Sequence, residues 1–369
     1  MEQAWIAGKP ATLDSAVAAA AKLLAASRQP LIAGLGTDVA GARAAIALAE
    51  RTGAIIDHMN SDAVLRGLDV MRSSGVMLTT PSEAYARADT LLLAGEIFGA
   101  GEIGSTKRLF DQLARRQGQH GTARRVYWLC PGGELAKRAP NEISLTFVGK
   151  QPRALPAVLA ALRARVAGRP TTGAAASQKI LDEAATGLQA AQFGVAIWSP
   201  QALDALTIEM LCGLISDLNA TTRFCALPLT PGDNAIGVLQ TCGWMTGMPM
   251  RTGLGRGFAE HDPWLFDSTR LVESGETDCV VWISAYRAQA PRWRGLPPTI
   301  ALTGRDAGFR SRPRVHIAVG RPGVDHIAVE HVSLTGTLAT VEATQPSGAI
   351  STAEAIRRIC AALPGEPPC

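Results

Sequence analysis

The sequence predicts an α/β protein made of two doubly wound, Rossmann-like lobes, each with a mainly parallel sheet. Short runs that are apolar on both faces, such as PLIAGLG (30–36) and TLLLAGE (90–96), alternate with helical segments, which is typical of buried parallel strands. The alternation repeats after residue 177, and 369 residues are enough for two or three domains. In such folds, ligands bind at the carboxyl ends of the strands.

The first block of elements begins with a helix whose N-cap candidates are Thr12 and Asp14. Gly53 is placed to close the second helix as a C-terminal cap, and Pro81 to open the third. The expected helices are 12–27, 39–53, 81–88, 105–118 and 151–166, and the expected strands are 30–36, 54–57, 89–96 and 124–130, with a less regular stretch after 57.

The second block repeats the order of helix and strand and then ends differently. Segment 332–343 is typical of a strand pair that turns at Gly336, and Ser351 with Glu354 has the sequence of a capping box before a terminal helix. The expected helices are 177–192, 204–220, one that opens within 231–244, and 351–363, and the expected strands are 193–200, 224–229, 278–284, 298–304 and 314–320.

The domain division rests on a small, polar stretch, Ala167–Ser177, which is the expected boundary. Residues 31–166 are predicted to form the first α/β lobe. Residues 170–330 are predicted to form the second lobe together with the N-terminal helix in 1–30, whose assignment is left open. Residues 331–369 are expected to be a C-terminal hairpin and helix.

The charge is nearly balanced, with 36 Lys and Arg against 32 Asp and Glu, so a dense nucleic-acid-binding surface is not expected. Seven widely spaced cysteines without a C-x-x-C pair disfavour a structural zinc or iron–sulfur site and fit a reducing compartment. The chain opens without a signal-peptide pattern, and its longest apolar helical stretch is interrupted by Lys22. We expect a cytoplasmic protein that binds neither nucleic acid nor membranes.

Two glycine-containing loops follow expected strands. Gly99–Gly104 matches G-x-G-x-x-G, but the next strand ends in Cys130 and Pro131 without an acidic residue, so a flexible loop is favoured over dinucleotide binding. Gly34–Gly41 is interpreted as a tight strand-to-helix turn. The sequence has no G-x-S-x-G elbow and no Walker lysine, which disfavours α/β-hydrolase and P-loop chemistry.

Few polar residues are placed for chemistry. His58 follows Asp57 at a strand end and His261 lies in a loop, and each is interpreted as a surface or hydrogen-bonded histidine. His326 and His331 are five residues apart in a strand-like segment, which sends them to opposite faces and disfavours a zinc site.

The glycine-rich segment Gly247–Trp264 carries Arg251 and Arg256. Arginines on such loops can clamp phosphate or carboxylate, and they can equally hold a partner chain. A plain connecting loop, an interface and an anion site are therefore all open interpretations of this segment.

Several ordered segments resemble the B subunit of formylmethanofuran dehydrogenase, a relative of the large molybdopterin oxidoreductase subunits. The resemblance implies their two-lobed α/β architecture. The segments span nearly the whole chain and are RQPLIAGLGTDVAGARAAIALAERTGAIID (28–57), ADTLLLAGEIFG (88–99), PGDNAIGVLQTCGWMTGMPMRTGLGRGF (231–258), ESGETDCVVWISAYR (273–287) and STAEAIRRICAALP (351–364).

The departures from that family concern sulfur ligands. Members that carry a tungsten or molybdenum pterin begin with cysteines for a [4Fe–4S] cluster and have a cysteine or selenocysteine metal ligand just after the equivalent of 54–57. Here no cysteine precedes Cys130, and the window His58–Val64 contains none. Because metal ligation and electron transfer need those sulfurs, we expect neither the pterin nor the cluster, no N-terminal iron–sulfur domain, and no catalytic, cofactor-binding or metal-binding residues.

With these departures, the pattern is similar to the formyltransferase/hydrolase branch of the family in methylotrophic bacteria. This resemblance implies a non-catalytic, structural B subunit that assembles with the A, C and D subunits. Such a complex moves a formyl group from formyl-tetrahydromethanopterin to a methanofuran-type amine and hydrolyses it to formate during one-carbon oxidation. The chemistry would lie on a metal-dependent amidohydrolase-like A subunit and a formyltransferase D subunit.

Two alternatives stay open at the level of sequence. The chain could be a working pterin-dependent oxidoreductase in which Asp57, Ser61 or Asp62 replaces the thiolate ligand. The former cofactor cleft could also bind an anionic coenzyme tail through Arg251 or Arg256.

Overall fold

The computed structural model describes residues 4–97, 124–132, 144–172, 176–293, 295 and 297–365. The chain divides into two compact units, each assembled from separate stretches of sequence. Unit 1 contains Met1–Ser61, Asp233–His331 and Leu338–Cys369, and unit 2 contains Asp62–Gly232 and Val332–Thr337. The predicted Gly99–Gly104 loop and the predicted helix 105–118 lie outside the described residues.

The sheet of unit 2 is entirely parallel in its described part, as predicted, with the order β7-β6-β5-β8-β9. Its central strand β5 is buried at every position, which explains its continuous apolar sequence. The strands are β5 (Thr90–Ala94), β6 (Arg125–Leu129), β7 (Ser144–Val148), β8 (Gly194–Trp198) and β9 (Phe224–Pro228). Of these, β7 was not predicted.

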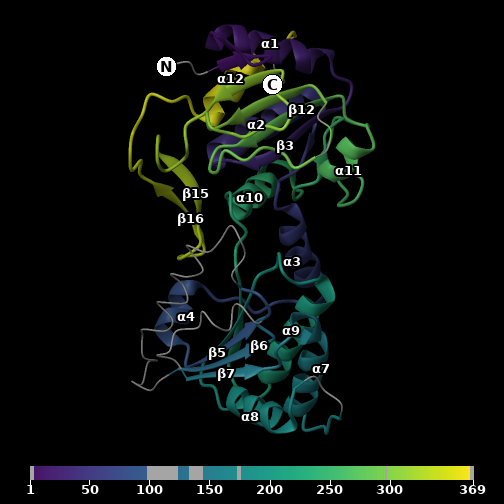
Figure 1. Ribbon diagram of the computed structural model, residues 1–369, viewed down its shortest axis with the longest axis vertical. Coiled ribbons are helices and arrows are strands. Elements are labelled where there is room, and N and C mark those ends of the chain that lie inside the picture. The colour runs from purple at the N-terminus through teal and green to yellow at the C-terminus, as the bar shows by residue number, and fades with distance from the viewer. Residues whose placement is uncertain are drawn as a thin grey trace. The chain divides into compact units, whose positions relative to one another are not determined.

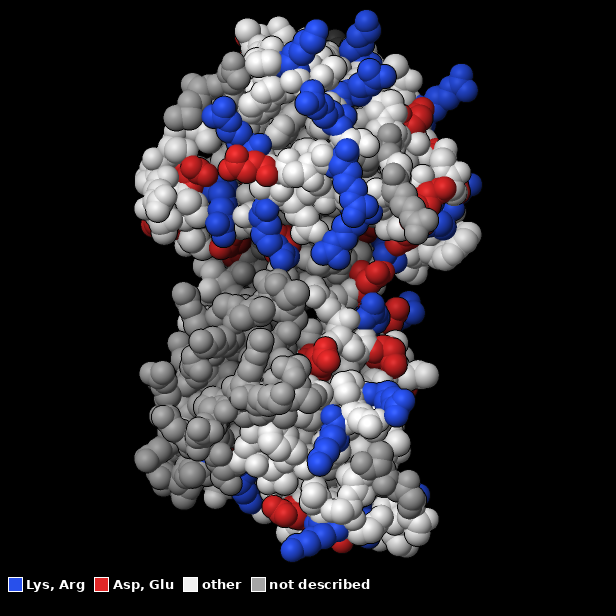
Figure 2. Space-filling model, in the orientation of Figure 1, with Lys and Arg blue, Asp and Glu red and all other residues white. Residues whose placement is uncertain are grey.

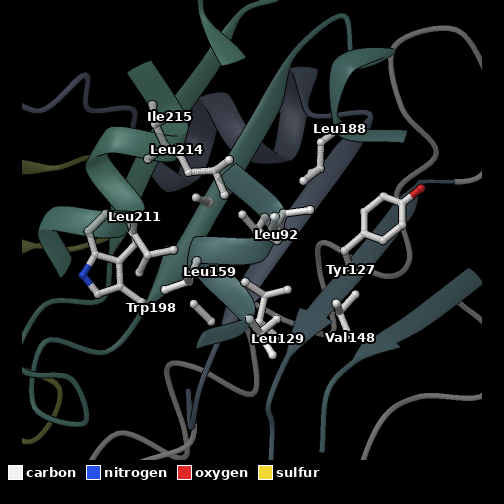
Figure 3. Close-up of a cluster of buried hydrophobic side chains, with 14 of the residues drawn as sticks. Leu92, Tyr127, Leu129, Val148, Leu159, Leu188, Trp198, Leu211, Leu214 and Ile215 are labelled. Atoms are coloured by element: carbon white, nitrogen blue, oxygen red, sulfur yellow. The ribbon is translucent and has the colours of Figure 1, made fainter. Parts of the chain in front are cut away.

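Helices cover both faces of this sheet. On one face, α7, α8 and α9 enclose a large apolar cluster with β5, β6 and β8 (Figures 1 and 3). On the other face, Ala84 and Tyr85 of α4 pack onto Leu91, Trp128 and their neighbours. The helices of this region are α3 (Ser61–Ser74), α4 (Pro81–Arg87), α7 (Leu155–Val166) after the 3-10 turn Pro152–Ala154, α8 (Gln178–Gln189) and α9 (Ala205–Leu218).

The sheet of unit 1 is mixed, which corrects the expectation of a mainly parallel second lobe. Strands β4, β3, β12, β13 and β14 are parallel, whereas β10 with β11 and β1 with β2 add antiparallel ribbons at the two edges. These strands are β1 (Ala4–Ile6), β2 (Lys9–Ala11), β3 (Pro30–Gly36), β4 (Ile55–Ile56), β10 (Thr252–Gly253), β11 (Glu260–His261), β12 (Cys279–Ser284), β13 (Thr299–Thr303) and β14 (Val315–Ala318).

Three helices of unit 1 have predicted caps, with Thr12 before α1, Gly53 after α2 and Ser351 before α12. The Thr12 hydroxyl accepts the Ser15 N–H at the start of α1, and Gly53 closes α2 in the left-handed conformation. The helix α12 packs on α2 (Figure 1), so the C-terminal helix is part of unit 1 and not of a separate terminal domain. The helices are α1 (Leu13–Ala26), α2 (Val39–Thr52), α10 (Ala235–Thr246), α11 (Ser268–Glu273) and α12 (Thr352–Ala361).

The predicted domain boundaries were wrong because the sheets pair strands that are distant in sequence. β3 pairs with β12 in unit 1, and β5 pairs with β8 in unit 2. Residues 31–166 are therefore split between the two units. The expected boundary Ala167–Ser177 lies within unit 2, where Gln189 of α8 donates to the Val166 carbonyl. The predicted hairpin is present as β15 (Ala328–Val332) and β16 (Thr337–Val341).

One glycine of β3 is required by a close backbone approach. At Gly34 φ is +80°, and a Cβ atom there would lie 2.4 Å from the Ile283 carbonyl oxygen. The ladder between β3 and β12 shifts register at this point, between Trp282 and Ser284. The glycine therefore allows β3 and β12 to stay paired up to their carboxyl ends.

Among the helices that the structure describes, none combines the length and apolar character needed to cross a bilayer.

Truncation of the unit 2 core tests this packing. Leu159 of α7 is fully buried in the apolar cluster, whereas Leu206 of α9 is 72% exposed. We expect Leu159→Ala to lower the free energy of unfolding by about 2–5 kcal/mol, because it leaves a cavity. The control Leu206→Ala should change it by about 0.5 kcal/mol or less. Equal effects in urea denaturation would contradict the assignment of this core.

Candidate functional site

The carboxyl ends of β3, β4 and β12 in unit 1 carry the polar residues of the candidate site. β3 is followed by Thr37 and Asp38, and β4 by Asp57 and His58. This is where a doubly wound sheet binds its ligand. All four of these residues are buried, so their polar atoms need partners within the protein. Together with six further residues, these four form what we call the polar cluster. The six are Asp233, Asn234, Arg251, Tyr286, Arg287 and Glu330.

His58 is a neutral imidazole with both ring nitrogens engaged. The Asn60 N–H donates to Nδ1 at 3.0 Å, so the ring proton is on Nε2, which donates to the Asp233 carbonyl at 3.1 Å. The side chain is fully buried, and burial lowers the pKa of His58 to about 4. A histidine bonded in this way is poorly suited to act as a general base or a metal ligand.

Asp233 and Asn234 both adopt the left-handed conformation, each with φ of 58°, immediately before α10. The buried Asp233 carboxylate forms a two-pronged ion pair with Arg287, in which Nε lies 2.9 Å from Oδ1 and Nη2 contacts Oδ2. The Asn234 amide donates to the Thr37 carbonyl and accepts the His331 N–H, each at 2.9 Å. These two side chains join three segments that are far apart in sequence.

Asp57 belongs to a buried ion-pair network. Its Oδ1 lies 3.6 Å from Nε of Arg251, and its Oδ2 accepts the Ser268 N–H at 3.0 Å. Arg251 also contacts the Asp267 carboxylate and donates to the Pro263 carbonyl at 2.7 Å. Burial raises the pKa of Asp57, and the positive charge of Arg251 opposes that shift. The network anchors the Gly247–Trp264 segment to the end of β4.

Tyr286 and Glu330 form a further pair. The Tyr286 hydroxyl donates to Oε2 of Glu330 at 2.6 Å. Burial and the neighbouring carboxylate both raise the pKa of Tyr286, so the phenol stays protonated. This pair ties the segment after β12 to β15, and both groups are thereby engaged within the protein.

The residues at the strand ends do not fit a tungsten or molybdenum pterin. The cysteines of the flanking elements, Cys242 of α10 and Cys279 of β12, are buried, and burial raises the pKa of each thiol to about 12. The possible oxygen ligands are already engaged, since Asp57 pairs with Arg251 and the Ser61 hydroxyl accepts the His58 N–H. Across the described residues, no three His, Cys, Asp or Glu side chains are grouped so that they could hold a metal ion.

Comparisons with known proteins identify the family of the chain. The chain is 36% identical over 351 residues to the B subunit of the formyltransferase/hydrolase complex of Methylorubrum extorquens, covering 93% of this chain and 92% of that protein. The chain belongs to this family of B subunits. A crystal structure of the Methylorubrum extorquens complex with methylofuran contains a chain that matches with a TM-score of 0.84 at 35% identity, covering 96% of this chain and 97% of that one.

A more distant relationship links this family to redox enzymes. The chain is 25% identical over 299 residues to the B subunit of tungsten-containing formylmethanofuran dehydrogenase 2 of Methanocaldococcus jannaschii, covering 75% of this chain and 65% of that protein. The resemblance noted in the sequence is thus confirmed. No protein-family profile matches the chain.

The structure places the sequence candidates in different roles. Asp57, His58 and Arg251 are brought together in the polar cluster as structural groups, with Asp57 and His58 buried and Arg251 partly buried. Arg256 lies apart from it, with a largely exposed side chain paired to Glu260. Asp62 is exposed in the first turn of α3.

Sequence reasoning missed Asp233, Asn234, Tyr286, Arg287 and Glu330. The dipeptide Asp233-Asn234 follows proline and glycine, which is a turn composition and the one local signal available. Tyr286 and Arg287 follow a predicted strand closely, so their position was also informative.

The two arginines of the Gly247–Trp264 segment provide a matched pair of variants. We expect Arg251→Met to lower the free energy of unfolding by about 3–5 kcal/mol, because Asp57 is left as an unpaired buried charge. Arg256→Met should change it by about 0.5 kcal/mol or less, because that ion pair is exposed. Chemical denaturation of both variants measures the difference, and similar values would argue against a buried network at Arg251.

The neutral state of His58 predicts a pH dependence of stability. The ordinary pKa of 6.5 applies to the unfolded chain and a pKa of about 4 to the folded one, so the unfolded chain binds more protons between these values. The contribution of neutral His58 to the free energy of unfolding is fully present above pH 6.5 and is lost as the pH falls toward 4. Relative to the His58→Gln variant, the free energy of unfolding of the wild type should fall by about 3 kcal/mol as the pH falls through this window. A pH-independent difference between the two proteins would refute the assignment.

Proposed function

We propose that this chain is the B subunit of a formyltransferase/hydrolase complex and that it holds the assembly together without a reaction centre of its own. In that complex, the A, C and D subunits would be its partners. The complex would transfer formyl from formyl-tetrahydromethanopterin to a methanofuran-type coenzyme and hydrolyse the product to formate. The observation that carries this proposal is the 36% identity along 93% of the chain to a B subunit of this kind.

The chemistry of the polar cluster supports a non-catalytic role. Formyl transfer needs a nucleophile and a base, and hydrolysis of a formamide needs an activated water. His58 has both nitrogens bonded, and Asp57 and Asp233 are paired with arginines. The groups at the strand ends therefore stabilise the fold of unit 1, and we place the reacting groups on the other subunits.

The same residues support the absence of a redox cofactor. A pterin-bound metal would supply two-electron chemistry, but the window His58–Val64 offers no thiolate to hold it. We therefore infer that the two units descend from the lobes of a pterin oxidoreductase and have kept the fold after loss of the metal site. The runner-up function, a dehydrogenase with an aspartate or serine ligand, would require Asp57 or Ser61 to leave its present partner.

Metal analysis of the assembled complex separates these two functions. We expect tungsten, molybdenum and iron to be far below one atom per copy of this chain. Elemental analysis of the complex purified through a tag on this chain provides the measurement. Stoichiometric tungsten or molybdenum, retained after gel filtration, would contradict the scaffold proposal, and so would catalysis by the isolated chain.

A further inference from the structure

One face of the unit 1 sheet carries half-buried aromatic rings. Trp5 of β1 pairs with His316 of β14 and stacks on it at 5.1 Å, and Phe309 meets the His316 ring edge-on at 5.7 Å. Paired residues of neighbouring strands point to the same side, so Trp5 and His316 share this face. The opposite face carries the fully buried Ala4 and Ile317, and α1 packs against these strands.

A loop covers this aromatic face. A doubly wound sheet usually has a helix between consecutive parallel strands, and each face is then fully covered. Here β13 and β14 are parallel and adjacent, but segment 304–314 connects them without a helix. The loop leaves Trp5, Phe309 and His316 only half-buried.

Three arginines line the end of the loop. Arg310, Arg312 and Arg314 are all exposed. Arg312 and Arg314 are exposed, whereas Pro313 and Val315 between and after them are buried, and the half-buried His316 follows in β14. The Arg312 side chain lies against Gly8 in the turn between β1 and β2, and the Arg314 carbonyl accepts the Ala7 N–H at 2.9 Å.

These three arginines have no acidic partner among the residues that the structure describes. Elsewhere in the same chain arginines pair with carboxylates, as in Arg163 with Asp217 and Arg270 with Glu276. Lys and Arg side chains also gather on the visible face of unit 1 (Figure 2). A cluster of arginines beside aromatic rings favours binding of a partner that presents carboxylates. Each guanidinium group can pair with a carboxylate through two hydrogen bonds.

We infer that the surface formed by Trp5, Phe309, Arg310, Arg312, Arg314 and His316, the arginine–aromatic surface, docks another subunit of the complex through that partner's acidic side chains. This inference rests on the proposed function, since it requires the complex to exist. Interface cores are enriched in aromatic residues and arginine, which is the composition of this surface. A nucleic acid fits less well, because three arginines form no extended basic stripe and the rings are stacked within the protein.

Charge reversal in the complete complex tests the inference. The variant R310E/R312E/R314E is co-expressed with the other subunits and purified through a tag on this chain. The control K22E/R28E/R43E makes the same change in charge at exposed positions away from the arginine–aromatic surface. We expect association with at least one other subunit to weaken roughly tenfold or more in the surface variant and not in the control. The neutral variant R310Q/R312Q/R314Q should show a smaller loss.

The outcomes distinguish this inference from the proposed function. If the wild-type chain recovers no other subunit, the proposed function fails. If the wild type recovers them and the surface variant does so equally well at every salt concentration, only the docking inference fails. Equal losses in the surface variant and the control would also overturn it. If the surface variant loses binding to a labelled duplex DNA but retains all the subunits, the surface is assigned to nucleic acid instead. An unchanged melting temperature of the variant confirms that it is folded.

Discussion

The structure of unit 1 depends on one set of buried hydrogen bonds around the neutral imidazole of His58. The chain passes between the two units after Ser61, before Asp233, after His331 and before Leu338. Ser61 and Asp233 are both bonded to His58, and His331 is bonded to Asn234, the neighbour of Asp233. Every polar group in this set has a defined partner, which is the condition for burying it at low cost. Three of these four crossing points are thereby held together within unit 1.

This constraint is consistent with the proposed role, in which a sheet with the topology of an enzyme carries no reaction centre. The carboxyl ends of parallel strands leave backbone and side-chain polar groups that a ligand usually satisfies. Here the protein itself satisfies several of these groups, because the Asn234 amide donates to the Thr37 carbonyl and Arg287 pairs with Asp233. Rebinding a cofactor would require these bonds to break and their groups to stay buried, at a cost of about 1–3 kcal/mol for each unsatisfied group. These internal bonds therefore stabilise the ligand-free form of unit 1.

Local sequence patterns predicted most elements but not their assembly. The apolar runs 30–36 and 278–284 were both expected as strands, but neither run contains a local signal that the two strands pair with each other. The helix Ser61–Ser74 was missed because Gly67 and four charged residues interrupt its apolar positions. At the site, Asp57 and His58 were recognisable by their position after a strand. Their partners Arg251 and Asp233 lie roughly two hundred residues away in the sequence, and only the fold brings them together.

The polar cluster and the arginine–aromatic surface are physically independent parts of unit 1. The cluster lies at the carboxyl ends of β3, β4 and β12, whereas Arg312 and Arg314 precede β14 at the amino end of the sheet. Three strand positions separate β3 from β14 in the sheet order, which corresponds to about 14 Å at the usual spacing of parallel strands. That distance exceeds the Debye length of about 8 Å at physiological salt, so exposed arginines at the edge scarcely influence the buried histidine. Under the proposed function, such a separation would let the carboxyl end of the sheet carry no reaction centre while charged contacts at the amino end hold a partner.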